Sequence, residues 1–207
     1  MAPVLERLDH RKQLKSLYGA SVAPSVVDVP AMTFLMLDGR GDPNTSPDYA
    51  SAIAALYSVA FTLKFGFKRG PQRIDFAVMP LEGLWWADDP KSFLLGDKSQ
   101  WQWTMMIMQP DFIRREDVDD AIATAARKRP NPMLAALRFE SFAEGRAAQM
   151  LYVGPYSAEG PAIAQLHAFI EGQGGKLAGK HHEIYLSDPR RVPVEKLKTI
   201  IRQPFTL

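Results

Sequence analysis

The stretch Met32-Thr-Phe-Leu-Met-Leu-Asp-Gly-Arg-Gly-Asp-Pro-Asn-Thr45 decides the first half of the fold. Its first residues are almost entirely apolar and predict a buried strand, and the part rich in glycine, aspartate and proline predicts a turn. Ser46 and Pro47 then suit the N-cap and the first position of a helix. Apolar residues at helical spacing between Ile53 and Phe61 extend that helix over about residues 48–65. We therefore expect a strand, a turn and an amphipathic helix in succession.

Two further strands are expected after this helix. Ile74–Met79 and Trp101–Met108 are strand-like, and the segment Pro80–Trp86 separates them. A helix over about 116–128 begins with acidic residues and ends with basic ones, as the helix dipole favours, and Pro130 stops it. These charges indicate a solvated helix face rather than a functional site.

The C-terminal half shows the same order of elements. Strand, helix, strand and strand are expected at Arg146–Val153, 158–171, His182–Ser187 and Lys196–Gln203. The strand–helix–strand–strand order therefore occurs twice, at 31–108 and at 146–204, although the two halves share little sequence identity. Halves of this kind commonly pack about a pseudo-twofold axis and leave a cleft, where small ligands usually bind. We expect an α+β fold of one domain over 1–207, with antiparallel sheets forming a central ligand cleft.

The composition narrows the function classes. Of the 207 residues, 46% are hydrophobic and 23% are charged, which is ordinary for a globular protein. Lys and Arg number 25 against 23 acidic residues, and a net charge of +2 gives no support for a nucleic-acid partner. The polar lead-in 1–30, with one short helix around 8–18, has no apolar core of a signal peptide. With no apolar run near the length of a membrane span, we expect a cytoplasmic protein.

The strand around Glu183 holds the main candidate for chemistry. In a strand, Ile184 and Leu186 face one side, and Glu183 and Tyr185 face the other. A carboxylate beside an aromatic ring on a partly buried face can have a raised pKa and can pair with a cation. An edge-strand glutamate in solvent is the competing interpretation.

A metal site or a cofactor is not expected. His181 and His182 are neighbours in a strand, so their side chains point in opposite directions and do not converge on one ion. The chain has no cysteine, which excludes thiolate ligands, disulfides and thiol nucleophiles. Gly39-Arg-Gly41 lacks the spacing and the lysine of a phosphate loop and indicates a turn.

The tryptophans form a second candidate feature. All four lie in the short region that contains Trp85, Trp86, Trp101 and Trp103. Trp101 and Trp103 share one strand face and could form a flat wall for a planar ligand, since aromatic rings and methionines suit hydrophobic or cationic compounds. Large aromatic residues also fill cores, so the sequence leaves both interpretations open.

Several of these stretches together resemble one family. They include Phe34–Asn44, Pro80–Trp86, Trp101–Pro110, Val153–Tyr156, His181–Arg190 and the tail Lys196–Pro204. In this pattern the chain is similar to stand-alone GyrI-like (gyrase-inhibitor-like) proteins from about Val29 to Pro204. The resemblance implies the fold of the effector-binding domains of multidrug-responsive regulators, in which a glutamate lies at the bottom of the cleft. Glu183 falls on that glutamate's motif.

The resemblance also implies an activity, because some stand-alone members hydrolyse cyclopropanoid toxins. Water would attack the cyclopropane methylene, and the dienone would become a phenolate. Such a reaction needs a general base, an oxyanion donor and flat walls. We expect Glu183 as base, Tyr152 to position water or donate to the oxyanion, and Phe76, Trp85, Trp101, Trp103 and Tyr185 to contact the ligand. The family often has histidine where Tyr152 stands.

Two other functions remain compatible with the sequence. One is a binding module that sequesters hydrophobic, aromatic or cationic small molecules without turnover. The other is a protein-interaction role such as gyrase inhibition, which the near-neutral charge does not support. No helix-turn-helix is expected in residues 1–30, so we do not expect a DNA-binding regulator. The oligomeric state does not follow from the sequence.

Overall fold

A computed structural model describes residues 5–88 and 98–207 of the chain. Residues 89–97, which belong to the expected first repeat, lie outside these ranges. The described residues form two compact units. Unit 1 contains the chain up to Gln13, Met32–Met79 and Ala87–Phe142, and unit 2 contains Leu14–Ala31, Pro80–Trp86 and Ala143–Leu207.

The elements follow one another in a repeated order. In chain order they are β1 (Glu6–Leu8), α1 (His10–Gln13), α2 (Lys15–Tyr18), β2 (Ser25–Arg40), α3 (Pro47–Arg69), β3 (Ile74–Phe76), β4 (Leu81–Trp86), η1 (Lys98–Gln100), β5 (Gln102–Gln109), α5 (Arg115–Lys128), η2 (Pro132–Ala136), β6 (Arg138–Val153), η3 (Tyr156–Ala158), α6 (Gly160–Gly172), β7 (Lys176–Leu177), β8 (His181–Tyr185), η4 (Val194–Lys196) and β9 (Lys198–Thr206). The order strand, helix, short strand, strand, strand occurs from β2 to β5 and again from β6 to β9. This confirms the predicted α+β class and its repeated element order.

The first half departs from the prediction in one segment. The expected strand over 74–79 is the short β3, which pairs in parallel with β1 of the lead-in. Pro80–Trp86, predicted as a separating segment, contains the strand β4, whose residues pair with β8. The strand was not predicted because proline and glycine are typical of turns. Gly83 is needed here for a different reason: a Cβ at this position would lie only 2.7 Å from Nε1 of Trp85.

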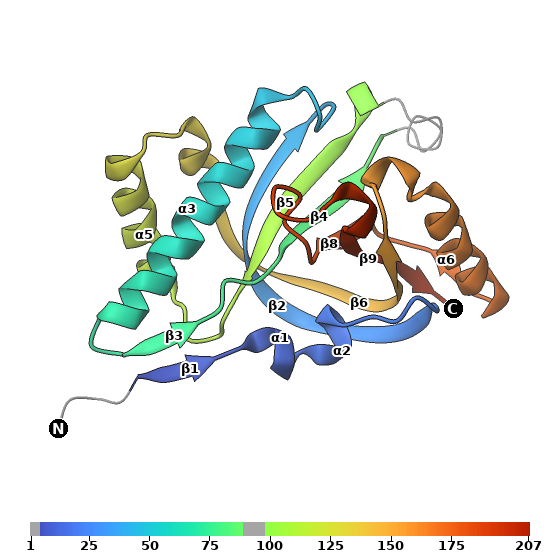
Figure 1. The fold of residues 1–207 in the computed structure, drawn as a ribbon, viewed down its shortest axis with the longest axis horizontal. Helices are drawn as coiled ribbons and strands as arrows, with labels where there is room; N and C mark the ends of the chain where they lie inside the picture. Colours follow the sequence, from blue (N-terminus) through green and yellow to red (C-terminus); the bar gives the residue numbers. More distant parts are fainter. Residues whose placement is uncertain (1–4, 89–97) are drawn as a thin grey trace. The chain divides into compact units, whose positions relative to one another are not determined.

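Unit 1 is built on β2 and β5, which pair antiparallel from Thr33 opposite Gln109 to Arg40 opposite Gln102. Leu35 and Leu37 of β2 lie opposite Ile107 and Met105 of β5, and all four are fully buried. Residues of the alternate face are buried as well, so both sides of this pair are apolar. Helix α3 packs against β5 and against α5, which lies beside it in Figure 1.

Gly39 fixes the contact between β2 and β5. A Cβ at this position would lie 2.1 Å from ring atoms of Trp103, so no side chain fits there. Trp103 is fully buried, and the ring of Tyr49 from α3 meets it edge-on at 5.3 Å. The indole therefore joins one strand pair and one helix within unit 1.

Helix α3 is long and apolar enough to cross a membrane by length and composition alone. One 18-residue window has a mean hydropathy of 1.4, and 39% of that window is buried. The core helix of a globular protein passes the same test. The buried residues of α3, from Ala52 to Phe67, recur at helical spacing and face the core of unit 1. This packing accounts for part of the apolar composition of α3.

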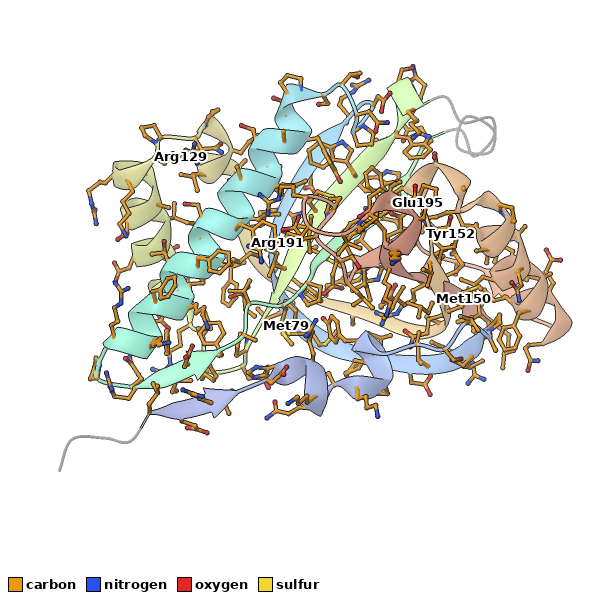
Figure 2. The ribbon with its side chains drawn as sticks, in the orientation of Figure 1. Met79, Arg129, Met150, Tyr152, Arg191 and Glu195 are labelled. Atoms are coloured by element: carbon orange, nitrogen blue, oxygen red, sulfur yellow. The ribbon has the colours of Figure 1, made fainter. Side chains whose placement is uncertain are left out.

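Unit 2 contains an antiparallel sheet in which β8 pairs with β4 and β9, and β9 also pairs with β6 and β7. Helix α6 covers one face of the sheet, where Leu166 and Ile170 pack with residues of β6 and β9. Met150 and Tyr152, labelled in Figure 2, belong to this face of β6. We call it the α6 face and the other side of the sheet the opposite face.

Candidate ligand-binding and catalytic site

Strand β8 presents different chemistry on its two faces. Glu183 lies opposite Ile201, and Tyr185 lies opposite Thr199, which in turn faces Tyr152. Directly opposed residues of antiparallel strands share a face, so Glu183, Tyr185 and Tyr152 belong to the α6 face. His182 and Ile184 therefore belong to the opposite face. The predicted alternation along this strand is confirmed.

Glu183 is held by hydrogen bonds on both of its carboxylate oxygens. The Tyr185 hydroxyl donates to Oε2 at 2.8 Å, and Nε2 of His181 lies 3.2 Å from Oε1. The Glu183 side chain is 15% exposed, so it does not stand in open solvent. Burial raises the pKa of Glu183, but hydrogen bonds and charge from His181, followed by the Tyr185 bond, outweigh it and lower the pKa. The pKa shift is opposite to the raised value expected from the sequence.

A directional chain of donors leads to this carboxylate. Nε1 of Trp85 lies 3.1 Å from the Tyr185 hydroxyl. Because the indole can only donate, the hydroxyl oxygen accepts from Trp85 and its proton goes to Glu183. The ring of Tyr156, in η3, meets the ring of Tyr185 edge-on at 5.6 Å. Trp85 and Tyr185, both predicted to contact ligand, thus lie beside Glu183.

Tyr152 lies on the same face, and its hydroxyl is hydrogen-bonded to a backbone carbonyl. Its hydroxyl donates to the carbonyl of Pro155 at 3.0 Å. Gly154 has φ of 149°, and a Cβ there would lie 2.6 Å from the Tyr152 hydroxyl oxygen. Burial and the charge of Glu159 raise the pKa of Tyr152. The phenol is therefore neutral near pH 7 and is a donor rather than a base.

The other predicted ligand contacts lie in unit 1. Phe76 is 2% exposed and packs with Phe67 and Phe112 in an aromatic cluster. Trp103 is fully buried, as described above, and Trp101 is half-buried, with Nζ of Lys98 5.3 Å from its ring centroid. Phe76 and Trp103 pack as core residues, and a ligand contact for any of the three stays a prediction.

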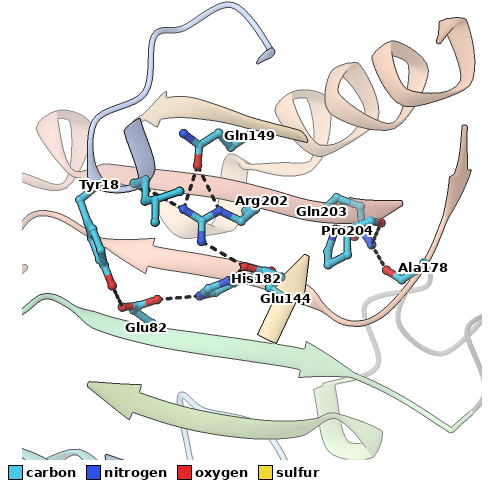
Figure 3. Close-up of polar contacts among 10 residues, drawn as sticks. Tyr18, Glu82, Glu144, Gln149, Ala178, His182, Arg202, Gln203 and Pro204 are labelled. Carbon is cyan, nitrogen blue, oxygen red and sulfur yellow. Dashed lines mark hydrogen bonds and ion pairs between the residues drawn. The ribbon is translucent and has the colours of Figure 1, made fainter. Parts of the chain in front are cut away.

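The opposite face of the unit 2 sheet carries a charged network that the sequence analysis missed. His182 lies between two carboxylates: Nδ1 is 2.9 Å from Oε1 of Glu144, and Nε2 is 3.0 Å from Oε2 of Glu82. Nη1 of Arg202 donates to Glu144 at 3.1 Å. Figure 3 shows these four residues together, and their side chains are at most 1% exposed.

The N-terminal segment completes this network. The Tyr18 hydroxyl donates to Oε1 of Glu82 at 2.7 Å, and Nη2 of Arg202 donates to the carbonyl of Leu17 at 2.6 Å. Gln149 accepts from Arg202 with its side-chain oxygen and donates to the carbonyl of Ser16 at 2.7 Å. Every charged member thereby has several partners, as burial requires.

The network is balanced in charge. Both ring nitrogens of His182 face carboxylates, so both carry protons and the ring is an imidazolium. Burial alone would lower the pKa of His182, but the charges and hydrogen bonds of Glu144 and Glu82 raise it to about 9. Burial alone would raise the pKa of Glu144, and His182 and Arg202 lower it to about 2. Two carboxylates thus meet one imidazolium and one guanidinium.

One signal in the sequence could have indicated this network. Glu82 stands between Leu81 and Gly83 in an otherwise apolar strand, and a charged side chain in such a run needs a buried partner. The identity of that partner does not follow from the sequence. Within residues 5–88 and 98–207, no group of three or more His, Cys, Asp or Glu side chains is placed to hold a metal ion.

Solved structures closely similar to this chain come from Listeria innocua. An uncharacterized conserved protein is 40% identical, with 96% of this chain and 100% of that chain covered and a TM-score of 0.89. A hydrolase is 38% identical, with 97% and 100% covered and a TM-score of 0.87. The C-terminal domain of EcmrR shares the fold at 14% identity, with 88% and 96% covered and a TM-score of 0.55.

Curated proteins gave no match to this chain. The sequence model of the GyrI-like small molecule binding domain matches residues 23–205. This match covers most of the chain and agrees with the likeness to the EcmrR domain, which shows the effector-binding-domain fold. The chain belongs to the GyrI-like family of small-molecule-binding domains.

Proposed function

We propose that this GyrI-like protein is a cytoplasmic, cofactor-independent hydrolase that detoxifies cyclopropanoid or similar planar hydrophobic compounds. The observation that carries the proposal is the Glu183 carboxylate, which is largely buried, ionised and held on both oxygens by Tyr185 and His181. A carboxylate of fixed orientation in a largely buried site is suited to take a proton from a bound water. The similarity to a Listeria innocua hydrolase at 38% identity supports a hydrolytic reaction.

The reaction needs a group that accepts the proton of water and a donor that stabilises the phenolate oxygen. A water oxygen forms a bond to the cyclopropane methylene while the bond from that methylene to the spiro carbon of the dienone breaks. The electron pair of that bond passes into the dienone and leaves a phenolate oxygen, and Glu183 takes the proton released by water. A phenol such as Tyr152 can stabilise the phenolate once its hydroxyl turns from the Pro155 carbonyl.

A second function is binding without turnover. An ionised, partly buried carboxylate beside the rings of Trp85, Tyr185 and Tyr156 suits a hydrophobic cation, because charge and aromatic faces both attract it. The fold shared with the EcmrR domain is compatible with this function. Sequestration would use the same side chains but would release no product.

Substitution of Glu183 by glutamine separates the two functions. With a spirocyclopropyl-cyclohexadienone substrate followed by absorbance, we expect kcat/KM of E183Q to fall by roughly 10²–10⁴-fold, the usual contribution of a general base. The control is E195Q, since Glu195 is an exposed glutamate of η4 (Figure 2). Wild-type turnover in E183Q would remove Glu183 as base. Saturable tryptophan quenching without product in the wild type would favour sequestration.

A further inference from the structure

Gly83 is the residue of β4 that stands directly opposite Glu183 in β8. Directly opposed residues of antiparallel strands share a face, so a side chain at position 83 would project beside the Glu183 carboxylate. Glycine inside a strand weakens it, and it is favoured where another group approaches the backbone closely. The groups that approach Gly83 belong to the donor chain of Glu183.

The two donors of this chain reach each other from the ends of the β4–β8 ladder. Trp85 pairs with His181, and Tyr185 pairs with Leu81. Trp85 and Tyr185 are therefore four residue steps apart, which is about 13 Å along the strands. Their side chains lean toward each other, and Nε1 of Trp85 comes to lie 3.1 Å from the Tyr185 hydroxyl. The middle of the span is occupied by Gly83.

The space above Gly83 is filled by this hydrogen bond. A Cβ on Gly83 would lie 2.7 Å from Nε1 of Trp85 and 3.1 Å from the Tyr185 hydroxyl oxygen. Non-bonded carbon and nitrogen atoms pack at about 3.5 Å or more, so a methyl group would push the indole away. One added carbon would thus displace the donor and crowd the acceptor of the same bond.

The Trp85–Tyr185 bond determines where the Tyr185 proton points. Because the indole occupies the hydroxyl oxygen as an acceptor, the hydroxyl proton is left for Oε2 of Glu183, 2.8 Å away. Linked hydrogen bonds polarise one another, so the first bond strengthens the second. The bond from Tyr185 stabilises the ionised form of Glu183, and it is one of the causes that lower the pKa of this carboxyl.

We propose that Gly83 is a positioning residue, which by carrying no side chain lets Trp85 and Tyr185 meet over β4 and so fixes the direction of the hydrogen bond to Glu183. A larger residue at this position separates the donor from the acceptor. The consequence for catalysis rests on the proposed function. The effect of Gly83 on the hydrogen bonds does not, and it is measurable without substrate.

Nitrogen-15 NMR of the tryptophan indole groups tests the first bond. The N–H signal of Trp85 is assigned by its loss in W85F. In the wild type we expect this proton to exchange slowly with solvent, because it is buried and hydrogen-bonded. In G83A its exchange should be roughly threefold to tenfold faster, as the loss of one hydrogen bond implies. An unchanged Trp85 signal and exchange rate in folded G83A would overturn the proposal.

Carbon-13 NMR of glutamate labelled at the side-chain carboxyl tests the second bond. The Glu183 signal is assigned by its loss in E183Q. Y185F removes the bond, and we expect the titration midpoint of Glu183 to rise by about one to two pH units. G83A and W85F should each give roughly a third of that rise, the share that linked bonds add to each other. A Glu183 midpoint in G83A at or below that of the wild type contradicts the positioning role.

The matched control is Gly39→Ala, which also adds a methyl group against an indole. A Cβ at Gly39 would lie 2.1 Å from ring atoms of Trp103, but this contact belongs to unit 1. G39A should therefore lose stability by overpacking and leave the Glu183 midpoint unchanged. A Glu183 shift in G39A as large as that in G83A would mean general loosening, and the positioning role would be wrong.

A second background keeps the test decisive if Gly83→Ala unfolds unit 2. In Trp85→Leu the indole is gone, so a methyl group at position 83 meets no ring nitrogen. Adding G83A should then lower the urea midpoint by at most about half as much as it does in the wild type, because the two positions are coupled. Equal losses in the two backgrounds would show that the close approach is not the reason for glycine at this position.

Kinetics test the catalytic consequence once turnover is established. We expect kcat/KM of G83A to fall by roughly tenfold or more, since a misdirected base is costly. The acid limb of its pH profile should move to higher pH by the amount that the Glu183 signal moves, because both report the free enzyme. A wild-type rate and profile in G83A would overturn the catalytic consequence. If the wild type turns over no cyclopropanoid, the proposed reaction fails, while the NMR measurements still decide the role of Gly83.

Discussion

Unit 1 and unit 2 bury different kinds of side chain. Among the described residues, the buried polar side chains of unit 1 are Thr104 and Gln109, and its core is otherwise aliphatic and aromatic. In the described part of unit 2, the buried polar side chains are Glu82, Gln149, Glu159, His181, His182, Thr199, Arg202 and Gln203. Unit 1 is therefore stabilised mainly by packing, whereas unit 2 combines an apolar core under α6 with a buried charged network. This difference predicts that pH and single charge changes act on unit 2, whereas volume changes act on unit 1.

The largest effect is expected from Arg202→Met. The substitution preserves length but removes the guanidinium, which leaves the Glu144 carboxylate buried with less compensation. Breaking a buried pair in this way typically lowers the free energy of unfolding by roughly 3–5 kcal/mol. Urea denaturation measures the change.

The control for Arg202→Met is Arg190→Met. Arg190 contacts Asp188 at 2.9 Å, but its side chain is 84% exposed. Exposed pairs contribute little, so this variant should change the free energy of unfolding by about 0.5 kcal/mol or less. Similar losses in the two variants would contradict the assignment of unit 2 stability to buried charge.

The next effect is a loss of stability at alkaline pH. The pKa of His182 is about 9 in the folded chain and 6.5 without the fold, so the folded state binds its proton more tightly. The stabilisation is complete below about pH 6.5 and disappears as the pH rises through 9, a loss of about 3 kcal/mol. Urea denaturation between pH 6 and 10 should show this slope, and His182→Gln should flatten it. A wild-type curve as flat as that of the variant would contradict the imidazolium assignment.

The same ion pair predicts a loss of stability in acid. The Glu144 pKa of about 2 lies below its ordinary value of 4.5, so its contribution is present above about pH 4.5 and is lost as the pH falls toward 2. Both losses belong to one interaction, which is broken from opposite ends of the pH range. The alkaline and the acid losses of unfolding free energy should therefore not be added to each other.

The smallest of these effects is expected in unit 1, from Gly39→Ala. The new methyl group would overlap the Trp103 ring, and overpacking of this kind costs about 1–3 kcal/mol. Gly66→Ala in α3 is the matched control, because no atom lies within 4 Å of its Cβ position and alanine favours helix. Urea denaturation at two pH values should give the same loss for Gly39→Ala at both. A strong pH dependence would remove the contrast between the two units.

The sequence alone predicted the helices and strands better than it predicted which residues contact one another. The helix from Pro47 and the alternation of Glu183 and Tyr185 follow from local spacing, which periodicity reports directly. Strand β4 was missed because Pro80 and Gly83 resemble turn residues, and only its pairing with β8 makes it a strand. A contact between Leu17 and Arg202 joins positions 185 residues apart, and no local pattern encodes such a distance.

The Ser16–Tyr18 segment has a practical consequence for defining the domain. The family match begins at residue 23, yet Ser16, Leu17 and Tyr18 bind Gln149, Arg202 and Glu82 inside unit 2. A protein trimmed to the matched region would lose two carbonyl acceptors and one phenol donor from a buried network. The folding unit thus begins upstream of the residues that the family model matches, and expression boundaries chosen from that match would cut through its core.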